Sequence, residues 1–287
     1  MSDSLERHAL EAEPAREARP ERRRPPRGVW VGASIVLLYV LIAIFAPLIA
    51  PHDPLAQEPL SALASPSADH PLGTDELGRD VLSRLIYATR VDLLVGFLGA
   101  LLPAIVGTAL GAIAGYRGGW RDAAVMRTAD VVQAFPTYIL IIALVSAFGQ
   151  GVPTILVAFT IIAWVVYARL IRTEILRVRG LDYVQAARAA GLPHRRILWR
   201  HVLPNAGGQV IVYLPSDIVI ATLGLAALSF LGLGIRPPTP EWGAMIAAGQ
   251  PYIRDQWWLS TVPGLVVVGF GLGLSLIAEG MEEWFRR

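Results

Sequence analysis

Six long apolar runs dominate the sequence and decide what it can fold into. A helix that crosses a bilayer needs about 20 apolar residues, because its backbone polar groups must bond within the segment there. The runs therefore predict an all-α, polytopic membrane protein with six transmembrane helices, with the lipid bilayer as its first partner. We expect the spans at about 28–50, 93–116, 123–148, 153–170, 206–233 and 261–278.

The composition agrees with a membrane protein and excludes several other classes. Of the 287 residues 54% are hydrophobic and 17% are charged, and the mean hydropathy is +0.50. The absence of Cys excludes disulfides and thiolate metal sites. The absence of Lys excludes a Walker A phosphate loop, so the chain is not expected to hydrolyse ATP itself. The sequence shows no catalytic set of residues and implies no cofactor.

The amino-terminal region admits two interpretations. Residues 1–27 mix Glu with Arg without apolar periodicity, which predicts a disordered tail. The run 28–50 follows several arginines, as in a secretory signal peptide, but signal-peptide cores are shorter, about 7 to 15 residues. We therefore predict a retained first helix and a transmembrane domain over 28–287.

The arginines predict the orientation of the chain in the membrane. With six spans and the amino terminus in the cytoplasm, 20 of the 25 basic residues fall on the cytoplasmic side and 5 on the other. Cytoplasmic loops carry an excess of basic residues in membrane proteins. We therefore expect both termini in the cytoplasm of a multi-pass inner-membrane protein. This distribution also explains the basic pI without a nucleic-acid partner.

A polar segment, 171–205, separates the fourth and fifth spans and is rich in Arg and Ala. Ala and Arg favour a helix over its first half, and Gly191 can end that helix in a left-handed conformation. Pro193 suits the first turn of a second helix, which we expect Pro204 to limit. The segment therefore predicts a cytoplasmic helix-turn-helix. Without a partner, the same pattern fits an amphipathic surface loop.

This segment resembles the cytoplasmic loop of ABC-importer permeases, whose pattern is Glu-Ala-Ala, three residues, Gly, then a distal Leu-Pro. Here Gln185 stands in place of the Glu, and the other matching positions are Ala186, Ala187, Gly191, Leu203 and Pro204. In that family the loop docks into a cleft of the ATPase subunit. The resemblance implies that the ATPase-coupling residues are Gln185, Ala186, Ala187, Gly191, Leu192, Pro193, His194, Arg195 and Arg196.

Other runs resemble one group of these permeases, which transports dipeptides, oligopeptides or nickel. They are His70–Arg84, Leu228–Gly234 and the Pro-x-Trp-Gly run Pro240–Gly243, and the resemblance extends over about 28–284. It implies a type I ABC-importer permease fold. It also implies a second related permease as heterodimer partner, two ATP-binding subunits and a substrate-binding protein. Dipeptide, longer peptide, glutathione-like peptide and nickel all remain open as substrates.

The connection after the first span contains Asp75, Glu76 and Asp80, interleaved with Arg79 and Arg84. Three carboxylates can bind a metal, but the arginines argue against this, and we predict no metal site. Thr74 or Asp75 can cap a short amphipathic helix here. His194 and His201 are seven residues apart beside several arginines, which also makes a poor cation site.

Within the spans, three patterns predict packing. Gly99, Pro103, Gly107, Gly111 and Gly115 recur every four residues, which makes a smooth helix face for close approach of another helix. Pro136 predicts a kink in the third span. Arg127 and Asp130 are three residues apart and are expected to pair.

Asp217 lies inside the fifth span, where a carboxylate is costly unless it faces water or a partner. It is either hydrogen-bonded within the bundle or a polar point on the translocation path that attracts an ammonium group or cation. The group often has an acidic residue just before Leu-Ser-Phe-Leu-Gly, and this sequence has none there. A secondary transporter would show internal repeats, and an intramembrane enzyme would need paired catalytic groups. The sequence shows neither feature.

Overall fold

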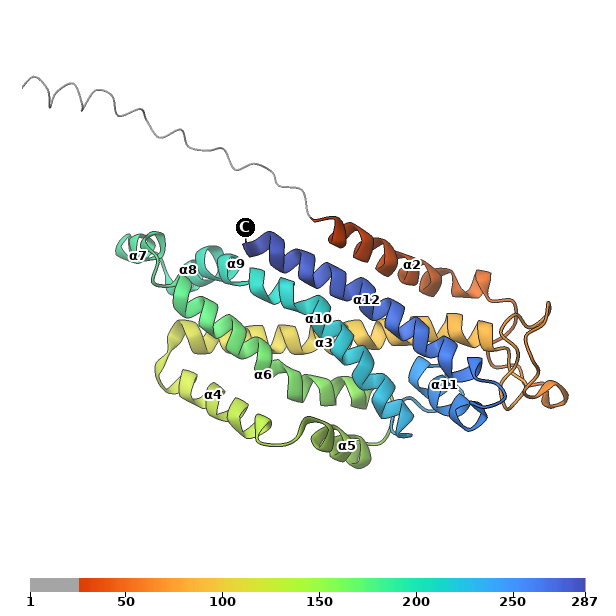
Figure 1. Ribbon diagram of the computed structural model, residues 1–287. Helices are drawn as coiled ribbons and strands as arrows, with labels where there is room; N and C mark the ends of the chain where they lie inside the picture. Colours follow the sequence, from red (N-terminus) through yellow and green to blue (C-terminus); the bar gives the residue numbers. More distant parts are fainter. Residues whose placement is uncertain (1–25, 287) are drawn as a thin grey trace, which may run out of the picture.

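The computed structural model describes residues 26–286, and these are almost entirely helical (Figure 1). The predicted tail, 1–27, lies outside the described residues except for its last two positions. In chain order the elements are α2 (Arg27–Ile49), η1 (Pro59–Ser61), α3 (Val81–Arg117), α4 (Gly119–Gln133), α5 (Thr137–Phe148), α6 (Val152–Val178), α7 (Asp182–Ala189), α8 (His194–Ile197), η2 (Leu198–Val202), α9 (Leu203–Ala206), α10 (Gly208–Phe230), α11 (Trp242–Gly249), η3 (Gln250–Tyr252) and α12 (Trp258–Arg286).

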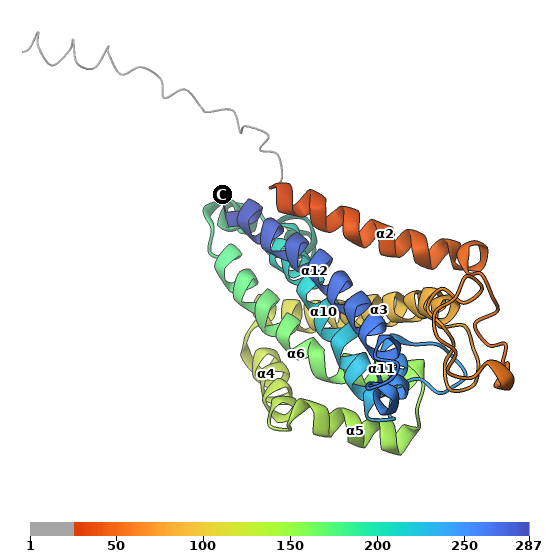
Figure 2. The same ribbon diagram turned by 45° about the vertical axis from the view of Figure 1, so that its right-hand side comes forward.

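The long helices form one bundle around α3 (Figures 1 and 2). Within residues 26–286, five helices are long and apolar enough to span a membrane, namely α2, α3, α6, α10 and α12, and the bent pair α4–α5 can supply a sixth span. The short helices α7, α8 and α9 lie at one end, beside the end of α12, while the 50–80 segment and α11 lie at the other (Figure 1). The predicted all-α membrane fold is confirmed.

Helix α3 begins earlier and runs further than predicted. Asp80 is its N-cap and accepts a 2.7 Å hydrogen bond from the backbone N–H of Ser83. The short helix expected near 74–85 is therefore wrong, because residues 74–80 form a turn and Val81 begins the spanning helix itself. No Gly or Pro interrupts residues 81–92, so the helix continues directly into the membrane span.

The predicted glycine stripe of α3 packs against α6. A Cβ at Gly107 would overlap the carbonyl oxygen of Trp164, and one at Gly111 would overlap the carbonyl oxygen of Ala168. At Gly115 a Cβ would lie 3.0 Å from the carbonyl oxygen of Arg172. Successive turns of the stripe thus follow the α6 backbone, which confirms the predicted close approach.

The third span is broken where the sequence predicted a kink. Helices α4 and α5 meet at 87° across residues 134–136, which end in Pro136. A proline has no N–H to donate and its ring obstructs the preceding turn, so α4 ends before it and α5 begins after it. The single continuous span at 123–148 is therefore a bent pair, beginning at Gly119.

The predicted pairing of Arg127 with Asp130 is wrong. Asp130 instead pairs with Arg169 of α6 at 2.6 Å, and Asp122 pairs with Arg172 of α6. Both pairs join α4 to α6. The two carboxylates point toward α6 because Arg169 and Arg172 of that helix lie opposite them, within ion-pair distance.

A further element, α11, was not predicted. It is eight residues long and contacts α3, α10 and α12. Trp242 at its start is fully buried, and Glu241 caps it by accepting hydrogen bonds from the N–H groups of Gly243 and Ala244 at 2.7 and 2.8 Å. The backbone N–H of Trp242 donates to Asp92 of α3, which fixes α11 to the core.

The polar segment is shorter than predicted. Helix α6 continues to Val178, so the segment between the long helices runs from residue 179 to the start of α10 at Gly208. Ile171, Ile175 and Val178 extend the apolar face of α6 and are buried under the short helices. The apolar face of α6 therefore continues past the predicted end of the span, and the short helices bury this extension.

Candidate functional site

The turn after α7 has a fully formed helix C-cap. Gly191 is left-handed with φ +74°, as predicted, and its N–H donates to the carbonyl of Arg188 at 2.9 Å. The N–H of Leu192 donates to the carbonyl of Ala187 at 3.2 Å. These two bonds are those of a Schellman motif, with the accompanying apolar contact of Leu192 against the cluster that contains Ala187.

The predicted coupling residues divide into an inner and an outer set. Ala187 is buried and Leu192 is half-buried, both in an apolar cluster with Ala112, Tyr116 and residues of α6. The methyl group of Ala187 thus packs α7 against its own bundle, and the ATPase-coupling role of this residue stays a prediction. The exposed members are Gln185, Ala186, Gly191, Pro193, His194, Arg195 and Arg196.

An exposed tryptophan completes the outer set. Trp199 is 63% exposed and lines a shallow surface hollow with Pro193, Arg195 and Arg196. A large ring left in solvent beside two arginines is typical of a protein contact surface. Trp199 was not among the residues predicted from the sequence, although an aromatic residue within a polar, basic segment is a signal for such a surface.

The second helix does not end at Pro204 as predicted. The chain continues from α8 through a π-helical turn, η2, into α9, where Pro204 occupies the first turn. A proline is tolerated in a first turn, since its missing N–H has no helical partner there. The chain then enters α10 directly after Gly207, so the short helices are continuous with the membrane bundle.

Asp217 lies deep in the bundle and has a hydrogen-bond partner. It is 6% exposed, and the hydroxyl of the fully buried Tyr167 donates to its Oδ2 at 2.9 Å. Asp217 also lines a hollow whose wall includes Tyr138 of α5 and Phe159 of α6. The carboxylate is therefore hydrogen-bonded within the bundle, and its role on the translocation path stays a prediction.

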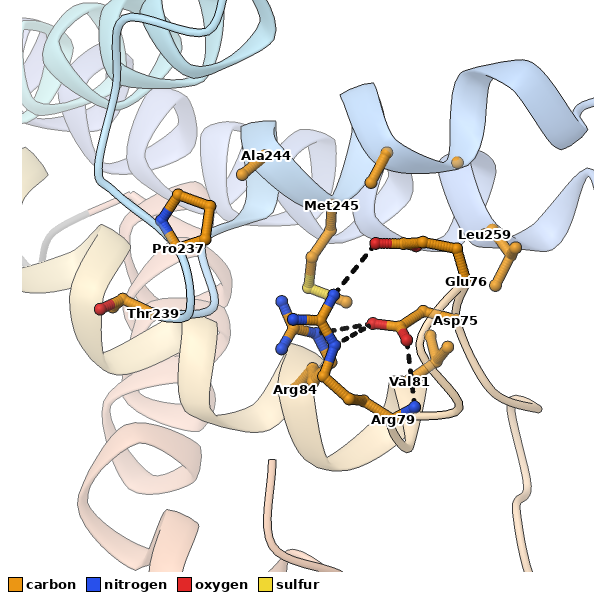
Figure 3. Close-up of a pocket in the computed structure, with 12 residues that line it drawn as sticks. Asp75, Glu76, Arg79, Val81, Arg84, Pro237, Thr239, Ala244, Met245 and Leu259 are labelled. Carbon is orange, nitrogen blue, oxygen red and sulfur yellow. Dashed lines mark hydrogen bonds and ion pairs between the residues drawn. The ribbon is translucent and has the colours of Figure 1, made fainter. Parts of the chain in front are cut away.

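Asp75, Glu76, Arg79 and Arg84 line another pocket, between the 50–80 segment and α11 (Figure 3). Arg79 pairs with Asp75 at 2.7 Å and with Glu76 at 3.1 Å, and Arg84 pairs with Asp75 at 3.3 Å. Asp75 and Glu76 are thus neutralised by the arginines that are interleaved with them in the sequence. Asp80 belongs to a different cluster.

Comparison with known proteins identifies the family. Residues 107–287, more than half of the chain, match the family described as binding-protein-dependent transport system inner membrane component. The chain belongs to this permease family. Residues 26–66 of the permease also match the amino-terminal transmembrane domain of oligopeptide transport permease C.

Individual relatives cover nearly the whole permease. It is 37% identical over 270 residues to the dipeptide transport system permease protein DppC of Alkalihalophilus pseudofirmus, covering 94% of this chain and 88% of the relative. It is 34% identical to the oligopeptide transport system permease protein OppC of Bacillus subtilis, covering 91% and 86%. The resemblance to ABC-importer permeases of the C type is confirmed.

A solved structure supports the fold. The MetNI methionine ABC transporter in an inward-facing conformation matches the permease with a TM-score of 0.56 at 16% identity, covering 71% of this chain and 95% of the other. The permease thus has the type I importer fold. As a membrane component of an ABC importer, it works with ATP-binding subunits and a substrate-binding protein.

Substitutions at Gly191 are expected to follow backbone preference rather than size. A Cβ there meets nothing within 4 Å, so the left-handed backbone is the constraint, at about 1–2 kcal/mol for an ordinary residue. Asn tolerates this conformation, and a β-branched residue resists it most. The loss of ATP-driven transport should therefore be smallest for Gly191→Asn, larger for Gly191→Ala and largest for Gly191→Val. Equal losses for Asn and Val would contradict the backbone explanation.

Proposed function

We propose that this chain forms half of the translocation path of an ATP-driven peptide importer. The observation that carries the proposal is the exposed surface of Arg195, Arg196 and Trp199 on short helices that continue directly into α10. Movement of a partner at this surface would move the bundle. The relatives described above are named for dipeptides and oligopeptides, which favours a peptide substrate over nickel.

The proposal assigns the outer set to docking on an ATP-binding subunit. Gln185, Ala186, Pro193 and His194 flank the arginines on the same exposed segment. Exposed ion pairs contribute only about 0–1 kcal/mol each, so the aromatic ring of Trp199 is expected to contribute more than either arginine. The arginine distribution supports a cytoplasmic location of this surface and of both termini.

The hollow beside Asp217 supports pairing with a second permease. Tyr138 and Ile220 line this hollow, yet they are 51% and 56% exposed on the outside of the bundle. This chain bounds the hollow on one side. A translocation path there needs a second protein wall on the open side to keep lipid out. A second, related permease would provide that wall, and two ATP-binding subunits would then serve the pair.

Cysteine crosslinking tests the docking surface and the orientation together, since the native chain has no Cys. In the complete transporter, Arg195→Cys should crosslink to a cysteine in the cleft of the ATP-binding subunit, with a yield that changes when ATP is trapped. Leu60→Cys is the matched control, because Leu60 is fully exposed and belongs to the 50–80 segment, which lies at the opposite end of the bundle (Figure 1). It should react only with thiol reagents added from outside the cell.

Two outcomes would contradict this assignment. Crosslinking of the Leu60→Cys variant to the ATP-binding subunit would reverse the orientation. A failure of Arg195→Cys to crosslink under every nucleotide condition, while transport remains normal, would remove the docking role of this surface.

A further inference from the structure

Two histidines and two aspartates from separate segments meet at the α11 end of the bundle. His52 follows α2, Asp69 and His70 lie in the connecting segment, and Asp80 caps α3. The imidazole rings lie against each other with centroids 4.7 Å apart and planes tilted by 33°. Each ring has Asp80 on its Nδ1 side and Asp69 on its Nε2 side.

We propose that His52, His70 and Asp80 bind a transition-metal dication of the zinc class, with Asp69 as the outer partner of both imidazoles. The sequence predicted no metal site, and the inference departs from that prediction. It concerns the opposite end of the bundle from the docking surface and does not depend on the proposed function.

The ligand atoms already lie at nearly the required separations. Oδ1 of Asp80 is 2.9 Å from Nδ1 of His70 and 3.9 Å from Nδ1 of His52. One ligand atom from each residue lies within 4.8 Å of the others. A tetrahedral zinc site with bonds of about 2.0–2.2 Å places its ligand atoms roughly 3.3–3.6 Å apart. Small side-chain movements would therefore complete three corners and leave the fourth for water.

The carboxylates take two different roles. A metal bound at both Nδ1 atoms keeps a proton on each Nε2, and a carboxylate commonly accepts that N–H in metal sites. The oxygens of Asp69 lie 3.6 Å from Nε2 of His52 and 3.8 Å from Nε2 of His70. Asp69 is 83% exposed and can move closer, while Asp80 is 1% exposed and fixed.

The backbone holds the ligands in place before a metal arrives. The N–H of His52 donates to Oγ of Ser83 at 3.0 Å, and the N–H of His70 donates to Oγ of Ser67 at 3.0 Å. The second oxygen of Asp80 is occupied by the helix cap, which leaves Oδ1 for the cluster. Nδ1 of His52 is buried and has no hydrogen-bond partner within the described residues, so this nitrogen is available to bind a metal.

The donor set selects the type of metal. Two imidazoles favour Zn²⁺ and its neighbours, whereas Mg²⁺ and Ca²⁺ prefer oxygen ligands. Imidazoles bind a metal as neutral ligands, and Asp69 and Asp80 add two carboxylates, so this set of groups suits a dication. A bound ion would join the end of α2, the connecting segment and the start of α3 at one point.

The test is zinc titration of the complete transporter, purified through a tag without histidine and stripped with a chelator. Calorimetry should show one zinc site per copy of this chain. His52→Gln and His70→Gln should abolish that site, and Asp69→Asn should weaken it about tenfold to a hundredfold. His201→Gln, a histidine outside the cluster, is the matched control and should bind zinc as the wild type does.

Size-exclusion chromatography establishes that each variant is folded, and Asp69→Asn provides a test on an exposed residue if a histidine variant fails to fold. The proposal is overturned if the wild-type transporter lacks this site. It is also overturned if zinc stoichiometry and affinity are the same in the wild type, Asp69→Asn and a folded histidine variant.

Discussion

Gly111→Val is expected to prevent the permease from reaching its native fold. The added side chain would meet the carbonyl oxygen of Ala168 and the side chain of Ile171, so α3 and α6 would have to separate. Overpacking a core typically costs about 1–3 kcal/mol, and here rigid backbone rather than a flexible side chain is in the way. We expect a cost of about 3 kcal/mol or more, seen as loss of monodisperse protein after extraction and as rapid proteolysis.

Gly264→Val provides the matched control for this experiment. Gly264 lies in a membrane helix, α12, and a Cβ there meets nothing within 4 Å. The same substitution should leave the yield and the protease resistance of the isolated chain nearly unchanged. If both variants behave alike, the loss reflects valine in a helix and not the contact between α3 and α6.

Asp217→Asn is expected to reduce peptide uptake about tenfold to a hundredfold. The change preserves the shape of the side chain and an oxygen for the Tyr167 hydroxyl, but it removes the negative charge beside the hollow. A hydrogen bond to a charged group contributes about 1.5–3 kcal/mol, which corresponds to this range. Uptake of labelled dipeptide into cells or proteoliposomes measures the effect.

The nature of the peptide separates a transport role from a structural one. A peptide with a free amino terminus should lose more uptake than its N-acetylated form, because only the free ammonium group responds to the charge. Tyr167→Phe is the control, since it removes the internal hydrogen bond and keeps the carboxylate. Equal losses for both peptides in Asp217→Asn would assign this residue to the stability of the bundle.

The sequence predicted those features that depend on local pattern. Apolar run length located α2, α3, α6, α10 and α12, and a four-residue glycine period identified the face of α3 that contacts α6. Gly191 was predicted to be left-handed because few other residues can end a helix in this way. Each of these signals is contained within one segment, so no knowledge of the neighbouring helices was needed.

Features that depend on neighbours were missed or wrong. The break at 134–136 lies in an apolar stretch, so hydropathy alone reads α4 and α5 as one span. Asp130 pairs with Arg169, 39 residues away in the sequence, instead of with the nearby Arg127. Helix α11 is too short to give a periodic signal. The sequence also does not show that Ala187 packs against its own bundle, since a methyl group suits both a buried and an exposed helix face.

The burial of the segment that carries the docking surface has a mechanical consequence. Ala187 and Ile197 share one apolar cluster with Tyr116 of α3 and Ile175 of α6, and α9 leads into α10 after Gly207. Close packing of this kind resists internal deformation. Under the proposed docking, the segment would therefore move as a rigid body with the bundle. A displacement of the partner at Trp199 would rotate α3, α6 and α10 together. A hinge would then have to lie outside these three helices, and we expect it at the break between α4 and α5.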